Sequence, residues 1–221
     1  FQKVYYHKVG TPQTQDELIL EDKENPKRLF GVNVTDDEKY LIISVSEGSS
    51  SYNLLWYKNL FNNSSIVKLI DSFDAEYNFI DNIDNKFLVL TNYQAPNNKL
   101  ILIDLKNPSK ENWKTIIPES KNVIQNVSRI GGKLIVTYLQ DASSKVSVFT
   151  EDGNYLYDIK LPTLGTVFGF SGKNKDKETF YTFTSFTYPP IIYRYDVQNN
   201  KSTLFKKSNI KFNMEDYETK Q

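Results

Sequence analysis

A polar turn followed by an apolar strand recurs in this sequence at a fixed spacing. The copies contain Lys39, Lys86 and Lys133, each 47 residues after the one before. A weaker fourth copy follows at Lys177, roughly one period later. Spacing of this kind indicates an architecture in which one small unit of secondary structure is repeated and stacked.

Short runs rich in Val, Ile, Leu, Tyr, Phe and Thr fill each unit, and Asn, Asp, Gly, Ser and Lys separate them. This pattern is typical of strands and turns. The third run of each unit resembles its counterparts, at residues 54–57, 100–104, 146–149 and 191–196. Four strands in about 47 residues match one four-stranded antiparallel blade of a β-propeller. We therefore predict an all-β fold of this kind, with an accidentally regular β-sandwich as the alternative.

We expect four blades, at residues 29–72, 73–119, 120–162 and 163–207, with residues 1–28 forming the outer strands of an earlier blade. Residues 208–221 are expected to be a tail. About four and a half blades do not obviously close a ring, so we expect a piece excised from a larger ring. A piece with open blade edges could also self-associate. The sequence lacks the repeat signatures of WD40 and kelch propellers.

Composition excludes several classes of function. The chain has 27 basic and 27 acidic residues and a net charge of zero, so no basic field exists to hold nucleic acid. No apolar run approaches the roughly 20 residues needed to cross a bilayer. One His and no Cys cannot build a multi-His or Cys-based metal site. No phosphate-binding glycine motif is present. We therefore expect a soluble chain without metal or cofactor, cytoplasmic, or periplasmic if a signal peptide lies upstream.

Few residues in the sequence are candidates for catalysis. His7, expected on a strand surface, is not accompanied by a Gly-x-Ser-x-Gly elbow, so a Ser-His-Asp triad is not expected. The nearest string, residues 169–172, is interpreted as a turn. A glycosidase would need two carboxylates, for which the candidates are Asp36, Asp37, Glu47, Asp81 and Asp84. Most of these acids are typical hairpin-turn residues, and Glu47 is expected just past a strand, in a Ser-rich loop.

An ordered set of strings spans almost the whole chain and, taken together, resembles the propeller domain of the prolyl oligopeptidase family of serine peptidases. The strings are residues 4–11, 26–27, 34–41, 44–48, 53–57, 67–71, 91–97, 169–172, 180–186, 190–193 and 216–219. The resemblance implies that the chain is the later part of a seven-bladed propeller that caps an α/β-hydrolase domain.

The same resemblance implies a function. The parent enzyme would cleave short peptides after proline, without metal or organic cofactor. The propeller would admit short peptides and exclude folded proteins. The catalytic triad would lie outside this segment, so the segment alone would be inactive. Its implied partners are the α/β-hydrolase domain, the remaining blades and short proline-containing peptides. A free-standing propeller that binds a protein or glycan is the alternative function, and a small propeller glycosidase is a third.

Family propeller residues that reach the active site correspond here to Leu29 and to the segment containing Ser46, Glu47 and Ser49. In many relatives the position of Leu29 carries Met, that of Ser46 carries Arg, and that of Ser49 carries Cys. Leu29 preserves an apolar wall. Ser46 lacks the forked cation of Arg, so the resemblance leaves an electrostatic link from this segment to the peptidase domain in doubt.

Overall fold

A computed structural model describes residues 1–62 and 64–209. The tail expected at residues 208–221, with the string at 216–219, therefore lies almost entirely outside the described residues. Within them the chain forms strands and two short 3-10 helices, Gln13–Gln15 and Lys110–Asn112.

The strands form one two-stranded hairpin and four four-stranded antiparallel sheets. The hairpin is β1 (Lys3–Tyr6) with β2 (Glu17–Glu21). The first sheet contains β3 (Arg28–Val34), β4 (Tyr40–Glu47), β5 (Asn53–Asn59) and β6 (Val67–Ile70). The second contains β7 (Tyr77–Ile83), β8 (Lys86–Thr91), β9 (Lys99–Asp104) and β10 (Lys114–Ile117). The third contains β11 (Val123–Ile130), β12 (Lys133–Gln140), β13 (Ser143–Thr150) and β14 (Tyr155–Asp158). The fourth contains β15 (Thr166–Gly169), β16 (Glu178–Thr184), β17 (Ile191–Asp196) and β18 (Lys201–Lys207).

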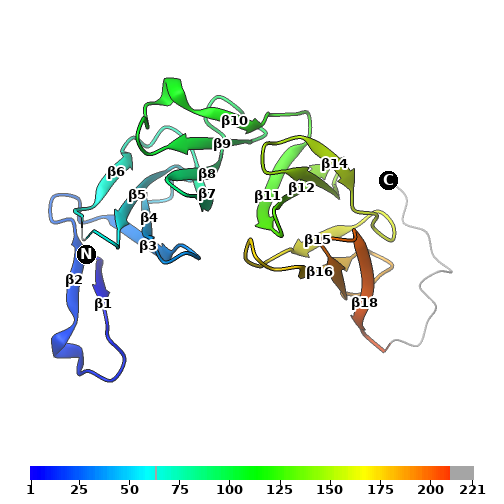
Figure 1. Cartoon of the computed structure of the whole chain (residues 1–221), viewed down its shortest axis with the longest axis horizontal. Coiled ribbons are helices and arrows are strands. Elements are labelled where there is room, and N and C mark those ends of the chain that lie inside the picture. The colour runs from blue at the N-terminus through cyan, green and yellow to red at the C-terminus, as the bar shows by residue number, and fades with distance from the viewer. Residues whose placement is uncertain (63, 210–221) are drawn as a thin grey trace.

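Each sheet is a meander in which neighbours in sequence are neighbours in space. The four sheets follow one another round an open arc, with their first strands on its concave side (Figure 1). The predicted all-β propeller fold with four-stranded blades is confirmed, and the ring is not closed.

Hydrophobic side chains fill the seams between successive sheets. In β8, Phe87 and Val89 face the first sheet, whereas Leu88 and Leu90 face the third. Successive residues of a strand point to opposite faces, so an unbroken apolar run is what a sheet buried on both sides requires. Burying each such side chain stabilises the fold by about 1.5–3 kcal/mol.

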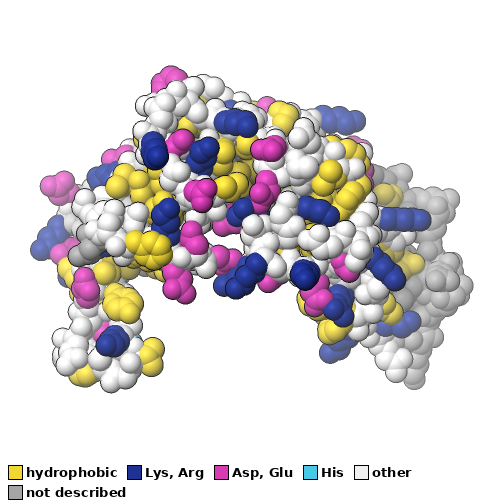
Figure 2. Space-filling view, in the orientation of Figure 1, with side chains coloured by type: hydrophobic (Ala, Val, Ile, Leu, Met, Phe, Trp, Pro, Cys, Tyr) yellow, Lys and Arg dark blue, Asp and Glu magenta, His cyan; other side chains and the backbone are white. Residues whose placement is uncertain are grey.

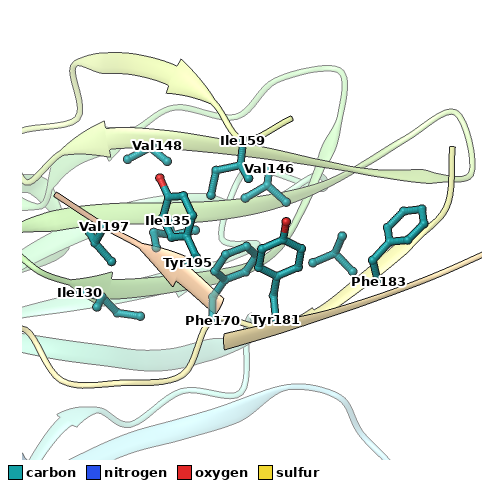
Figure 3. Close-up of a cluster of buried hydrophobic side chains, with 11 residues drawn as sticks. Ile130, Ile135, Val146, Val148, Ile159, Phe170, Tyr181, Phe183, Tyr195 and Val197 are labelled. Atoms are coloured by element: carbon teal, nitrogen blue, oxygen red, sulfur yellow. The ribbon is translucent and has the colours of Figure 1, made fainter. Parts of the chain in front are cut away.

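The seam between the third and fourth sheets is rich in aromatic rings (Figure 3). Phe170 stacks on Tyr181 with ring centroids 4.8 Å apart, and meets Tyr195 edge-on at 6.1 Å. Val148 and Ile135 complete the same cluster from the third sheet. The Tyr and Phe content of the chain is thus used to join neighbouring blades.

The repeated lysine has a structural explanation. The turn before it needs left-handed backbone, with φ of 60° at Glu38, 53° at Asp84 and 61° at Gly131. The lysine then begins or immediately precedes the second strand and can reach the next sheet. Lys39 Nζ donates to the Asp84 carbonyl at 3.5 Å, and Lys133 Nζ donates to the Val197 carbonyl at 2.6 Å.

The first hairpin corrects one expectation. β1 ends at Tyr6, so His7 does not lie on a strand surface. Strand pairing stops at Tyr6 and Glu17, and His7 Nδ1 instead lies 2.6 Å from Asp16 Oδ1. Val4 and Leu20 pack on the face of the first sheet that turns away from the second sheet.

Candidate functional site

The four sequence candidates lie at one end of the first sheet. At this end, called the loop end below, the second and third strands of each sheet are joined. The opposite end, the turn end, carries the turns between first and second strands. Leu29 on β3 lies directly opposite Ser46 on β4. Leu29 is 54% exposed, so its side chain is available at the surface.

Beside this pair runs a groove of about 300 Å³ at the seam of the first and second sheets. Gly31 and Ser44 form part of one wall and Tyr77 and Asn78 part of the other. A Cβ on Gly31 would meet nothing closer than the Ser44 carbonyl at 4.0 Å, so this position has room for a small side chain. The site therefore combines an exposed apolar side chain with a groove whose lining is mostly apolar and includes Ile42, Leu55 and Phe79.

Glu47 and Ser49 are separate from this pair. β4 continues through Glu47, so the expectation that Glu47 follows the strand is wrong. Strand pairing with β3 continues one residue beyond Ser46, which places Glu47 opposite Arg28. Because faces alternate along a strand, Glu47 lies on the other face from Ser46. Ser49 lies exposed in the loop that follows.

Arg28 was missed by sequence reasoning. Its Nη1 donates to Asp22 Oδ2 at 3.0 Å, and its Nε lies 3.6 Å from Glu47 Oε2. Burial raises the pKa of Asp22, but hydrogen bonds from Asn25 and Arg28 outweigh this and lower it overall. The sequence shows Arg28 next to Leu29, but only strand register reveals that it faces Glu47.

The far end of the loop is fixed by Asn53, which is buried at the start of β5. Its Oδ1 accepts from the Tyr77 backbone N–H at 2.7 Å, and its Nδ2 donates to the Tyr77 carbonyl at 3.0 Å. Asn98 Nδ2 donates to the Ile124 carbonyl at 2.8 Å in the same way, from the second sheet to the third.

The third sheet makes a similar side-chain-to-backbone hydrogen bond to the next sheet. Ser144 Oγ accepts from the Val167 backbone N–H at 3.0 Å, which joins the third sheet to the fourth. A polar residue at the start of the third strand is the sequence signal for these inter-blade clasps. They hold the loop end of the arc in register.

Charged side chains join the sheets at the turn end. Arg129 donates to Asp81 Oδ2 at 2.9 Å and to Glu151 Oε1 at 2.6 Å, so it links the third sheet to the second. Burial lowers the pKa of Arg129, and these two acids raise it above its usual range. Asn82 Nδ2 donates to Asp37 Oδ2 at 2.8 Å and links the second sheet to the first.

All four sheets contribute to a cavity of about 240 Å³ here, through residues that include Asp36, Asp81, Arg129 and Ser171. Asp36 Oδ1 lies 3.5 Å from Lys173 Nζ, so an ion pair joins the first sheet to the fourth. Over the face shown in Figure 2, acidic and basic side chains are interspersed. The turn-end acids thus serve contacts between blades.

Glu47 and Asp84, two of the candidate carboxylates, do not form a glycosidase pair. Glu47 lies at the loop end, whereas Asp84 lies in a turn at the turn end. At about 3.3 Å per residue, the eight residues of β4 separate these ends by roughly 25 Å. A glycosidase needs about 5 to 9.5 Å between its carboxylates. Asp81 is already paired with Arg129.

Over residues 1–62 and 64–209, no group of three or more His, Asp or Glu side chains could hold a metal ion. In that part of the chain no helix is long and apolar enough to span a membrane.

Comparison with known proteins gives one family. A profile described as "Prolyl oligopeptidase, N-terminal beta-propeller domain" matches residues 1–208. The prolyl endopeptidase of Elizabethkingia meningoseptica is 36% identical over 219 residues, which cover 99% of this chain and 31% of that protein. The prolyl endopeptidase of Dictyostelium discoideum is 35% identical, with coverage of 99% and 31%.

Solved structures agree with this. One structure from a study of two prolyl endopeptidases superposes with a TM-score of 0.88 at 30% identity, over 96% of this chain and 31% of that one. The unliganded prolyl oligopeptidase B of Galerina marginata has a TM-score of 0.88 at 26% identity, with the same coverage. The chain spans about a third of the length of these relatives.

Proposed function

Because this chain belongs to the prolyl oligopeptidase family, through its N-terminal β-propeller domain, we propose that it is the substrate-gating propeller segment of a serine peptidase. The parent enzyme cleaves short peptides after proline. The segment carries no catalytic triad and is inactive alone. The observation that carries the proposal is the match of the open arc, over 96% of this chain, to a third of a prolyl endopeptidase structure.

The gate in this proposal is steric. Leu29, Ser46, Glu47 and Ser49 lie at the loop end, where we place the α/β-hydrolase domain of the parent. The exposed Leu29 side chain forms an apolar wall for a short peptide. A folded protein is too wide for a cavity bounded by blades that hydrogen bonds and ion pairs hold together.

The partners in this proposal are the hydrolase domain, the remaining blades and short proline-containing peptides. Residues 1–28 belong to the blade before residues 29–72, and the tail from residue 208 leads toward the hydrolase domain. We place the parent enzyme in the cytoplasm.

The face of the fourth sheet that turns away from the third is apolar and exposed, which favours a larger ring in the parent. Phe168 and Phe205 are 60% and 61% exposed, and the rings of Phe180 and Phe205 meet at 4.9 Å. An apolar sheet face of this kind favours contact with another blade. We propose that a further blade of the parent covers it. The isolated segment then self-associates through this face, which sedimentation at increasing concentration detects.

Hydrolysis of a fluorogenic proline peptide tests the function. The full-length polypeptide containing this segment is expected to cleave it and to lose activity on treatment with a serine-directed phosphonylating reagent. The 221-residue segment is expected to show no turnover. Turnover by the pure segment refutes the proposal. A closed ring or symmetric dimer that binds a ligand at its axis would favour the free-standing binding module.

A further inference from the structure

The guanidinium of Arg28 is held on three sides. Its Nη1 donates to Asp22 Oδ2 at 3.0 Å, and its central carbon lies 5.7 Å and 5.8 Å from the ring centroids of Trp56 and Phe73. Only 14% of the side chain is exposed. Stacking of a guanidinium on aromatic rings restricts its orientation. Arg28 is therefore fixed in place before anything binds.

One donor of the guanidinium, the Nε–H group, lacks a hydrogen bond. Within the described residues, Arg28 Nε is the buried side-chain nitrogen or oxygen that has no hydrogen-bond partner. The nearest acid, Glu47, lies 3.6 Å away, whereas a charge-assisted N–H···O bond spans about 2.7–2.9 Å. An unmade hydrogen bond on a buried donor costs stability and calls for an explanation. A shift of the Glu47 carboxylate by about 0.7–0.9 Å would complete the bond.

The Glu47 side chain, just before the loop from Gly48 to Tyr52, is able to make that shift. Gly48 has a φ of +63° and nothing within 4 Å of the place a Cβ would occupy. The other end of the loop is clasped by Asn53. The Glu47 side chain is 41% exposed, so it has room to move. Asn53 thus fixes one end of the loop. At the other end Glu47 is paired with Arg28 in the β3–β4 register, and its carboxylate adds only a long contact with Arg28 Nε.

We propose that Arg28 is a positioning residue for substrate binding. A peptide that occupies the loop end brings the Glu47 carboxylate onto Arg28 Nε, and this holds the Gly48–Tyr52 loop next to Leu29 and Ser46. Arg28 raises substrate affinity without touching the substrate. The inference rests on the proposed function, since it assigns a role within the same gate.

Peptide hydrolysis by the full-length polypeptide tests the inference through Glu47→Gln and Arg28→Met. Each variant is expected to raise KM for a short proline peptide about tenfold, the effect of losing roughly 1.4 kcal/mol, with kcat within about twofold. Lys27→Gln changes an exposed charge next to Arg28 and is the matched control, with an unchanged KM. The double variant is expected to be no worse than either single variant, because both remove the same contact.

A second measurement does not depend on activity. Backbone amides of Gly48–Tyr52 are expected to exchange hydrogen faster in Glu47→Gln and Arg28→Met than in Lys27→Gln. Glu47 is half-exposed, so Glu47→Gln is expected to fold normally. An unchanged KM in both variants, or additive effects in the double variant, overturns the inference. So does a lower melting temperature with KM and loop exchange unchanged, because that is the signature of a purely structural arginine.

The two proposals fail in different ways. If wild-type polypeptide cleaves proline peptides and Glu47→Gln matches it, the role of Arg28 is wrong and the proposed function stands. If wild-type polypeptide does not cleave them, the proposed function is wrong. The proposed role of Arg28 in substrate affinity is then wrong as well. Amide hydrogen exchange of Gly48–Tyr52 still shows whether Arg28 holds Glu47.

Discussion

Replacing Asn53 by Ala removes the clasp between the first and second blades. Asn53 is 8% exposed and makes four hydrogen bonds, to Ser44 Oγ, the Leu54 carbonyl and both backbone groups of Tyr77. Alanine leaves the N–H and carbonyl of Tyr77 without these partners. A buried polar group that loses its partner costs about 1–3 kcal/mol. Two such groups give an expected loss of about 2–6 kcal/mol.

Urea unfolding of the 221-residue protein, followed by near-UV circular dichroism, measures this loss. Asn112→Ala is the matched control, because Asn112 makes one exposed side-chain hydrogen bond, to Asn107 at 2.8 Å. The control is expected to change the free energy of unfolding by less than about 0.5 kcal/mol. A loss below about 1 kcal/mol in Asn53→Ala would refute the reasoning, because it would mean that water or neighbouring groups satisfy Tyr77 equally well.

Three further predictions concern other contacts between blades. Gly153→Ala should lower the free energy of unfolding by at least about 2 kcal/mol, because φ is +87° and a Cβ would lie 2.0 Å from the Ile116 carbonyl oxygen. Gly31→Ala is the control, since a Cβ there has open space, and in the same urea titration it should change the free energy of unfolding by no more than about 0.5 kcal/mol. Phe87→Ala should cost about 3–5 kcal/mol, since the ring is fully buried, and calorimetry should show a lower melting temperature. Burial raises the pKa of Asp37, but its hydrogen bonds lower it overall. Its stabilising effect is therefore present above the unfolded pKa of about 3.9 and is lost at lower pH, so the stability difference between wild type and Asp37→Asn should shrink from pH 7 to pH 3.

Local pattern was sufficient to predict the fold. The Lys39, Lys86 and Lys133 repeat marks a turn and a strand, and both have short-range causes: left-handed turn residues and an apolar run buried on two faces. The blade architecture followed from that spacing. The strand boundaries shifted by a few residues where pairing continued past the apolar run, as at Glu47.

The site was harder to predict, because it depends on pairing between distant segments. Arg28 and Glu47 are opposite each other only because of the register of β3 and β4. Asn53 looks like an ordinary loop residue until the second blade places Tyr77 against it. His7 was assigned to a strand that in fact ends before it, and its partner Asp16 lies nine residues away. Composition and spacing carry no information about such partners.

Hydrolysis of a graded series of substrates tests the central claim most directly. The series runs from a short proline peptide to the same sequence placed within a folded protein, and the full-length polypeptide is compared with a version lacking the propeller. We expect intact polypeptide to cleave the short peptide and leave the folded protein intact, and removal of the propeller to abolish this discrimination. Equal discrimination without the propeller, or cleavage of the folded protein by intact polypeptide, would contradict the claim that these blades form a gate.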